Sequence, residues 1–292
     1  MQNYSIFNLI KNAFTNHQNW DLAWKDPTPK KEYDVVIIGG GGHGLATAYY
    51  LAKEHNITNV AIIEKGWIGG GNVGRNTTII RSNYMHDENA LFSEFGMNLW
   101  RKMSQDLNYN VMFSPRGIIN LAHSDAQMNA YARRGNSMRL NGIDALLLNR
   151  EQVKEIIPMA DFSDNVRFPI FGGLMQPSAG TARHDAVAWG YARQADSMGV
   201  DIIQNCEVTG FDISAGKIKG VRTSRGDIKV KKVGLCVAGS TNILAEKLNM
   251  TLPIETHLLQ ACVSEPVKPI LDRVVTFGAG HFYISQSDKG EM

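Results

Sequence analysis

One stretch near the N-terminus, residues 34–65, constrains the fold more than any other part of the chain. A β-branched run at 35–38 is typical of a buried parallel strand. Glycines that fit G-x-G-x-x-G follow it, then apolar residues at helical spacing, and then a second apolar run at 60–63 that ends in Glu64. This order of strand, glycine turn, helix, strand and acid predicts a βαβ unit that binds a dinucleotide.

Each position of this motif has a physical role. Gly39 permits a tight turn, Gly41 lets a pyrophosphate approach the backbone, and Gly44 lets the helix pack close to the sheet. The helix N-terminus offers free amides and a partial positive charge to the phosphates. Glu64 can accept hydrogen bonds from both ribose hydroxyls, and its charge disfavours NADP. The motif alone leaves FAD and NAD open, and its place near the start of a longer chain leans towards FAD.

The bulk composition excludes several classes of protein. With 292 residues, 43% hydrophobic and 20% charged, the chain is expected to form two globular domains. A net charge of +2 gives no argument for nucleic acid or membrane binding. Cys206, Cys236 and Cys262 form no C-x-x-C and no metal-ligand cluster, so we expect a reduced, cytoplasmic protein without a metal site. No apolar run approaches the ~20 residues of a membrane span, and no secretory signal is visible.

Residues 1–33 are predicted to form an N-terminal arm that packs on the domain or on a partner subunit. It would hold a short helix and then a linker at 26–31. Four apolar side chains would share one side of this helix: Ile6, Leu9, Ile10 and Phe14.

A second glycine-rich loop follows Glu64, with glycines at positions 69, 70, 71 and 74. Asn72 and Thr77 add polar groups, and Arg75 could meet a phosphate or a flavin carbonyl. Close to a dinucleotide motif, such a loop suits backbone approach to a cofactor. A surface loop without a ligand is the alternative.

The middle of the chain does not continue the βαβ pattern. We expect helices at 88–107, 124–142 and 150–157, and a strand at 111–121 with a turn at 115–117. This region is predicted to be an inserted, mainly antiparallel substrate domain.

The last third returns to the first domain. Asp185 can cap a helix that ends near Gly199, and strands are expected at 200–208, 218–222 and 233–238, with a β-meander over 207–230. Residues 234–240 are interpreted as a buried strand that ends at Gly239, where a cofactor could approach. Further strands are expected at 257–265 and 280–286.

The predicted fold is therefore α/β, with a Rossmann-like FAD-binding domain and an inserted antiparallel α+β substrate domain. The FAD-binding domain is expected at 34–110 and 180–256. The substrate domain is expected at 111–179 and 257–292, incomplete at the C-terminus.

Three stretches carry a resemblance to a known family. The sequences IIGGGGHGLATAYYLA (37–52), GGGNVGRNTTIIRSNY (69–84) and GTARHDAVAWGYAR (180–193) resemble the β subunits of heterotetrameric sarcosine oxidases, within the glycine-oxidase-like FAD-dependent oxidoreductases. The first stretch is shared by many flavoproteins, and the other two are more particular to these subunits. The similarity runs from about residue 20 to the last residue.

The resemblance implies a function for the chain. Such subunits bind FAD non-covalently and carry FMN covalently on the histidine that matches His184. They oxidise sarcosine at FAD, reduce O2 to H2O2 at FMN, and work with α, γ and δ subunits. Tetrahydrofolate and NAD bind the α subunit, and the one-carbon unit passes to tetrahydrofolate. The residues alone give His184 only the general usefulness of an imidazole.

The resemblance also implies a set of FAD contacts, and ordinary strand or turn packing would explain several of them equally well. These positions are Gly42, His43, Gly44, Glu64, Asn72, Arg75, Thr77, Ile79 and Val208. The stretch 257–260 and Lys268 are expected near the flavins. No residue is identified as a catalytic acid or base.

Three alternatives to this function stay open. Related glycine oxidases or dimethylglycine-type dehydrogenases share the dinucleotide motif, and a NAD-binding module is a weaker option. The chain also ends inside a predicted strand-and-turn region, so we expect a truncated product with unpaired sheet edges. A flavin-binding but inactive subunit is the non-enzyme alternative.

Overall fold

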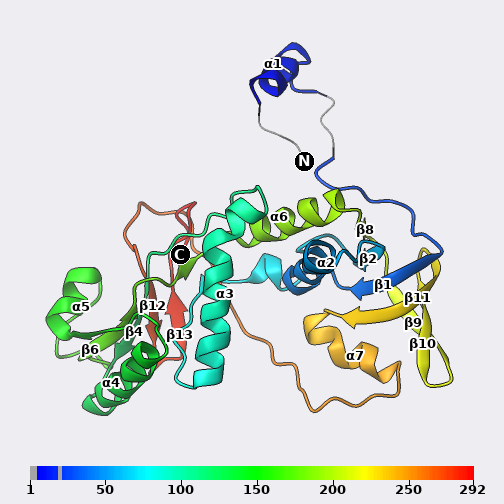
Figure 1. The fold of residues 1–292 in the computed structure, drawn as a ribbon. Helices are drawn as coiled ribbons and strands as arrows, with labels where there is room; N and C mark the ends of the chain where they lie inside the picture. Colours follow the sequence, from blue (N-terminus) through cyan, green and yellow to red (C-terminus); the bar gives the residue numbers. More distant parts are fainter. Residues whose placement is uncertain (1–4, 19–21) are drawn as a thin grey trace. The chain divides into compact units, whose positions relative to one another are not determined.

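The computed structural model describes residues 5–18 and 22–292, and these fall into two compact units (Figure 1). The first unit comprises residues 1–76 and 184–258, and the second comprises residues 77–183 and 259–292. Residues 77–110 and 180–183, expected in the cofactor domain, belong to the second unit, and residues 257–258, expected in the substrate domain, belong to the first. β3 (Ile79–Ile80) pairs with β7 (Gly180–Thr181), and Thr181 of β7 forms a bridge with Ser114 of the second unit.

A six-stranded sheet in the order β8-β2-β1-β11-β10-β9 forms the centre of the first unit. The central strand β1 (Glu32–Ile38) runs parallel to β2 (Val60–Ile63) and to β11 (Gly226–Leu235). β8 (Asp201–Ile203) extends the parallel part. The predicted strands at 35–38 and 60–63 are confirmed.

Helices cover both faces of this sheet. α2 (Gly42–His55) and α6 (His184–Ser197) lie on one side, and α7 (Thr241–Glu246) lies on the other (Figure 1). The edge of the Tyr49 ring on α2 meets Tyr191 on α6, with 5.4 Å between the ring centroids. α6 ends as predicted, because Gly199 adopts φ +94° just beyond it.

Beyond β1, the sheet continues through the predicted β-meander of β9 (Val208–Ser214), β10 (Lys217–Thr223) and the first part of β11. β10 pairs with β11 only as far as Lys229, whereas β1 pairs with β11 through Leu235. One long strand therefore serves both the meander and the parallel sheet. One core cluster packs strand residues of this sheet with Leu244 of α7, and it contains Tyr33, Val36, Ile38, Phe211, Val221, Ile228, Val230 and Leu244.

Two sequence predictions about strands of this unit were wrong. Residues 200–208 are not one strand, because β8 ends at Ile203 and its partner β2 already ends at Ile63. The predicted buried strand at 234–240 stops at Leu235, where β1 also ends. A 3-10 turn, η2 (Ala238–Ser240), follows it.

The N-terminal arm contains the expected helix, α1 (Ile6–Phe14). The Ser5 hydroxyl caps it by accepting a hydrogen bond from the amide of Asn8 at 3.2 Å. Its apolar side chains are exposed, from 47% for Ile10 to 88% for Phe14. Across the described parts of the chain, no helix is long and apolar enough to span a membrane.

The second unit is built on a five-stranded sheet in the order β13-β12-β4-β6-β5. β4 (Ile118–Ala122) runs parallel to β12 (Val274–Phe277), and the other neighbours are antiparallel. The remaining strands are β5 (Leu146–Asn149), β6 (Gly172–Gln176) and β13 (Phe282–Ile284). The expectation of a mainly antiparallel α+β unit is confirmed.

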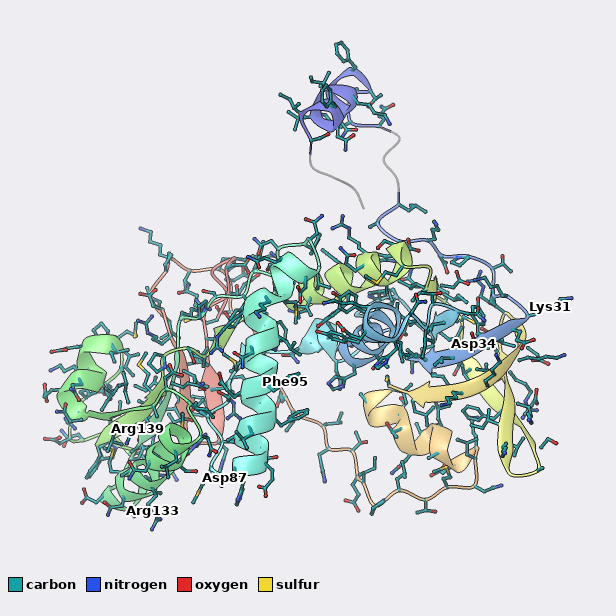
Figure 2. The ribbon with its side chains drawn as sticks, viewed as in Figure 1. Lys31, Asp34, Asp87, Phe95, Arg133 and Arg139 are labelled. Atoms are coloured by element: carbon teal, nitrogen blue, oxygen red, sulfur yellow. The ribbon has the colours of Figure 1, made fainter. Side chains whose placement is uncertain are left out.

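Three helices complete this unit, at the places where the sequence predicts them. They are α3 (Asp87–Asp106), α4 (Asp125–Leu140) and α5 (Arg150–Ile156). The Asn141 side chain donates to the Asp87 carboxylate at 2.8 Å and so joins the end of α4 to the start of α3. Phe95 on α3 is 64% exposed (Figure 2).

The sequence also predicted strands here that do not form. Of the expected strand at 111–121, only 118–121 lies in the sheet, as part of β4, since Gly117 turns the chain with φ +88°. Residues 257–265 pair with no strand and are exposed throughout. Their apolar spacing resembles a strand, but no sheet edge is adjacent to complete its hydrogen bonds.

Candidate dinucleotide site

The turn between β1 and α2 requires glycine at two positions. A Cβ on Gly39, where φ is +109°, would lie 2.3 Å from the carbonyl oxygen of Cys236. A Cβ on Gly44 would lie 2.0 Å from the carbonyl oxygen of Gly39. Neither backbone oxygen can move away cheaply, so the close approach of α2 to the sheet depends on these two residues.

The glycines between them leave open space. A Cβ on Gly41 or Gly42 would meet only Val73, at 3.8 and 3.7 Å. Gly41 is the N-cap of α2, so the first amides of the helix have no acceptor within the helix. Open space, free amides and the positive end of a helix dipole fit the pyrophosphate of a dinucleotide.

Glu64 lies at the end of β2 and is fixed from two directions. Its Oε2 accepts a hydrogen bond from the amide of Gly40 at 2.7 Å, and its Oε1 accepts one from the amide of Gly66 at 2.8 Å. Each carboxylate oxygen keeps a further lone pair, so acceptor capacity for ribose hydroxyls remains. The carboxylate also ties the glycine turn to the loop after β2.

The second glycine-rich loop lies next to the first. The amide of Gly69 donates to the carbonyl of Gly40 at 3.1 Å. Arg75, in the 3-10 turn η1 (Val73–Arg75), donates from Nη1 to the carbonyls of Gly70 at 2.7 Å and Gly71 at 3.1 Å. Arg75 and Asn72 are exposed. The Arg75 side chain therefore stabilises the loop to which it belongs, through hydrogen bonds to two of the loop's carbonyls.

Thr77 and Ile79 belong to the second unit, whereas the other predicted FAD contacts belong to the first. Ile79 pairs with Thr181 in the small β3–β7 sheet.

His184 is the first residue of α6 and is half-buried. The prediction that Asp185 caps this helix was wrong, because Asp185 lies inside its first turn. The Asp185 carboxylate accepts a hydrogen bond from the amide of Ala186 at 2.7 Å. A Cβ on Gly69 would lie 3.6 Å from Cβ of Ala188, so the second loop packs on the helix that His184 begins. The structure brings this helix, both loops and Glu64 together in one unit.

Val208 and Gly239 occupy ordinary structural positions. The side chain of Val208 is buried in the core of the first unit, and its backbone pairs with Thr223. Gly239 is exposed in η2, and a Cβ on it would lie 2.9 Å from Cγ2 of Thr256. Neither position by itself points to a ligand.

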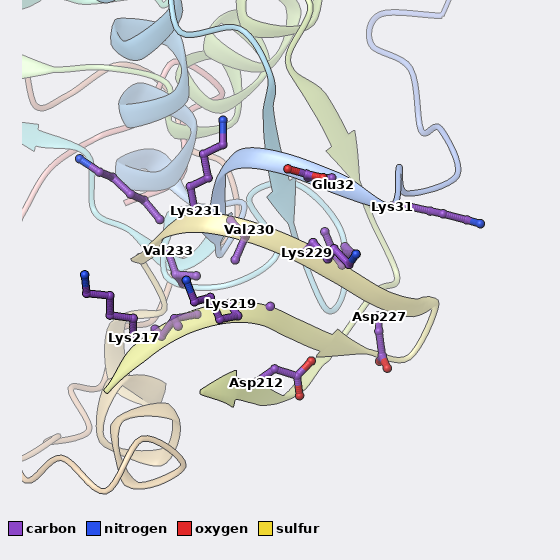
Figure 3. Close-up of a pocket in the computed structure, with 14 residues that line it drawn as sticks. Lys31, Glu32, Asp212, Lys217, Lys219, Asp227, Lys229, Val230, Lys231 and Val233 are labelled. Carbon is purple, nitrogen blue, oxygen red and sulfur yellow. The ribbon is translucent and has the colours of Figure 1, made fainter. Parts of the chain in front are cut away.

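A hollow of about 1100 Å³ lies elsewhere in this unit, along β1, β10 and β11 (Figure 3). Lys31 and Lys217 extend from it in different directions (Figure 3). None of the predicted site residues lines it. The residues around it include Lys31, Glu32, Asp212, Lys217, Lys219, Asp227, Lys229, Lys231 and Lys232.

Two arginines of the second unit were missed by the sequence analysis. Nη1 of Arg81 donates to Oδ1 of Asn83 at 2.5 Å, and Nη2 of Arg134 donates to the backbone carbonyl of Asn83. Burial and the nearby Arg81 cation lower the pKa of Arg134. No carboxylate within the described ranges forms an ion pair with either guanidinium.

Two neighbouring cations without a counter-ion are unusual in a partly buried place, because desolvation and mutual repulsion both disfavour them. An anionic ligand would relieve both effects. Arg81 lies in the 69–84 stretch that carries the family resemblance, but the two arginines are 53 positions apart (134 − 81), so no local motif could have signalled the pair.

Comparisons with known proteins agree with this geometry. The family model described as FAD dependent oxidoreductase matches residues 34–292. A protein of Rhizobium meliloti named sarcosine oxidase subunit beta is 61% identical over 99% of this chain and 69% of its own length. A protein of the same name from Rhodobacter capsulatus is 52% identical over the whole chain and 70% of its own length.

Among solved structures, the fold is similar to that of L-proline dehydrogenase from P. horikoshii. The TM-score is 0.80 with 27% identity, over 90% of this chain and 69% of that one. The chain belongs to the FAD dependent oxidoreductase family and, within it, to the group of sarcosine oxidase β subunits.

Proposed function

We propose that the chain is the β subunit of a multi-subunit oxidase that uses FAD to oxidise the C–N bond of sarcosine. The observation that carries this proposal is the 61% identity to a named sarcosine oxidase subunit beta over 99% of the chain. The steric requirement for Gly39 and Gly44 and the doubly bonded Glu64 support a dinucleotide cofactor.

FAD, when bound, supplies an acceptor for the two electrons that leave the N-methyl group of the substrate. The amides at the start of α2 would hold its pyrophosphate, and Glu64 would hold its ribose. Asn72 and Arg75 would cover it from the second loop, with Thr77 and Ile79 of the other unit. Val208 and Gly239 would contribute backbone contacts.

The substrate carries a carboxylate, and the unpaired arginines of the second unit are suited to it. Arg81 follows β3 directly, and its guanidinium lies over the ring of Tyr84 at 4.7 Å. A guanidinium recognises a carboxylate through paired N–H groups. Arg81 would therefore orient the substrate, with Arg134 adding positive charge behind it.

His184 would carry FMN covalently, and electrons would pass from FAD to FMN and then to O2, giving H2O2. A neutral imidazole can add to an activated flavin methyl group, and a half-buried position at a helix start leaves the ring accessible. The α, γ and δ subunits would complete the complex, with NAD and the tetrahydrofolate that accepts the one-carbon unit on the α subunit. The complex would work in the cytoplasm.

The test uses the chain co-expressed with these partner subunits. Sarcosine added without oxygen should bleach the flavin absorbance, and acid denaturation should leave FMN on the peptide that contains His184. His184→Ala should remove the covalent flavin and keep FAD. Bleaching by glycine or dimethylglycine but not sarcosine would favour the related oxidases, and protein without flavin would contradict the proposal.

A further inference from the structure

A buried polar network surrounds Ser82, the residue that follows Arg81. Ser82 and Gln176 have no exposed surface. The Ser82 amide donates to Oε1 of Gln176 at 3.0 Å, and Nε2 of Gln176 donates to the Ser82 hydroxyl at 2.7 Å. That hydroxyl in turn donates to Oε2 of Glu94 at 2.7 Å. Both polar groups of Ser82 that face the network are thus satisfied.

The network connects three elements of the second unit. Gln176 ends β6, Glu94 lies on α3, and Ser82 lies between β3 and α3. The other carboxylate oxygen of Glu94, Oε1, accepts a hydrogen bond from Nη1 of Arg101 on α3 at 3.1 Å. Hydrogen bonds of this kind are strong in a buried setting, and a fully satisfied network specifies one geometry.

The network extends on the other side of Gln176 as well. Nε2 of Gln176 lies 3.4 Å from the Ser178 hydroxyl, which donates to Oδ1 of Asp144 at 2.5 Å. The Ser178 amide donates to Oδ2 of the same carboxylate at 2.6 Å. Both the oxygen and the nitrogen of the Gln176 side-chain amide are therefore hydrogen-bonded, which holds this side chain in one rotamer.

Arg81 is consequently fixed on both sides along the chain. Ile80 before it pairs with Gly180 in the β3–β7 sheet, and Ser82 after it is held by Gln176 and Glu94. The position of its guanidinium is restricted further by the hydrogen bond to Asn83 and by the contact with the ring of Tyr84.

We infer that Gln176 and Glu94 are positioning residues that hold Ser82 and thereby aim the Arg81 guanidinium at the substrate carboxylate. The inference rests on the proposed function. It deepens that function by making selectivity for a carboxylate depend on a network that does not touch the substrate.

The experiment compares sarcosine with its neutral amide, which keeps the N-methyl group and lacks the carboxylate. Ser82→Ala and Gln176→Met are tested in the assembled complex, with calorimetric binding and anaerobic flavin reduction measured separately. We expect the dissociation constant for sarcosine to rise roughly ten- to hundredfold, with little change for the amide. The maximal rate of flavin reduction should change less than the affinity.

Ser124→Ala is the matched control. It removes a hydroxyl of the same unit that caps α4 by accepting a hydrogen bond from the Gln127 amide at 3.3 Å, far along the chain from Arg81. This variant should lose some stability and keep its selectivity between sarcosine and the amide. Ser82→Thr, which retains the hydroxyl, should restore much of the affinity.

Three results would overturn the inference. The first is an equal rise of the dissociation constants for sarcosine and for the amide in Ser82→Ala, and the second is the same loss of selectivity in Ser124→Ala. The third is a Ser82→Ala variant that folds normally and binds sarcosine as tightly as the wild type. If the wild-type complex binds sarcosine but its flavin is not reduced, the proposed function is refuted. The positioning role is then decided by the dissociation constants of the variants for sarcosine and for the amide. Wild-type complex that binds no carboxylate would overturn both.

Discussion

The two glycine-rich loops of the first unit look alike in sequence but are held in different ways. In the first loop, Gly39 and Gly44 are fixed by backbone atoms that a Cβ would contact at 2.3 and 2.0 Å. In the second loop, only Gly74 meets such a backbone limit, since its Cβ would lie 2.8 Å from the Gly69 carbonyl oxygen. A Cβ on Gly71 would meet nothing within 4 Å, and the Arg75 side chain bonds the carbonyls of Gly70 and Gly71. Glycine content alone therefore does not tell whether a loop is rigid.

The largest expected effect comes from Gly44→Ala. The new methyl group would overlap a backbone carbonyl, and overpacking of this kind costs about 3 kcal/mol or slightly more of unfolding free energy. Urea denaturation and the flavin-to-protein ratio would measure the loss of stability and of FAD. A variant with normal flavin content would refute the steric explanation of the first loop.

Glu64→Gln should have the next largest effect. The amide side chain presents an N–H₂ group to one of two backbone amides, so one charged hydrogen bond, worth about 1.5–3 kcal/mol, is lost. We expect FAD to bind about tenfold more weakly or worse in a titration with apoprotein. Glu54→Gln is the control, because the Glu54 side chain is 55% exposed on α2.

Arg75→Gln should act on the second loop alone. Arg75 is exposed, so unfolding free energy should stay within about 0.5 kcal/mol of the wild type. Loss of its bonds to Gly70 and Gly71 should speed hydrogen exchange at 70–76 and shorten the lifetime of bound FAD several-fold. Unchanged exchange would show that the loop is held by other contacts.

Gly71→Ala should have the smallest effect and completes the comparison. The position has open space and no left-handed backbone, so alanine should raise the free energy of unfolding by less than about 1 kcal/mol. Thermal unfolding measured beside Gly44→Ala would check this. A large loss would mean that the second loop packs as tightly as the first.

Local sequence patterns predicted the parallel strands, the glycine turn and the main helices well. The signals for β1, α2 and β2 lie within 32 residues, and each depends on neighbours along the chain. The same approach was wrong at 257–265 and 234–240, because a strand also requires a partner at the right place. That partner depends on the three-dimensional fold.

The candidate site shows the same limit. Steric demands at Gly39 and Gly44 followed from a motif, whereas Arg81 and Arg134 meet only because α4 packs on the segment after β3. Neither arginine stands in a recognisable pattern with the other. The role of Gln176 as an anchor for Ser82 was equally invisible, since 94 residues separate them.

The long strand β11 also has a consequence for how the chain is made. β1 has both of its neighbours only when residues 226–235 have left the ribosome, nearly two hundred residues after β1 itself. β4, β5 and β6 of the other sheet are complete by residue 176. During synthesis, the inserted unit can therefore begin to fold while one edge of β1 in the cofactor-binding sheet is still unpaired. An unpaired strand edge promotes aggregation, so the nascent chain most needs protection at this stage.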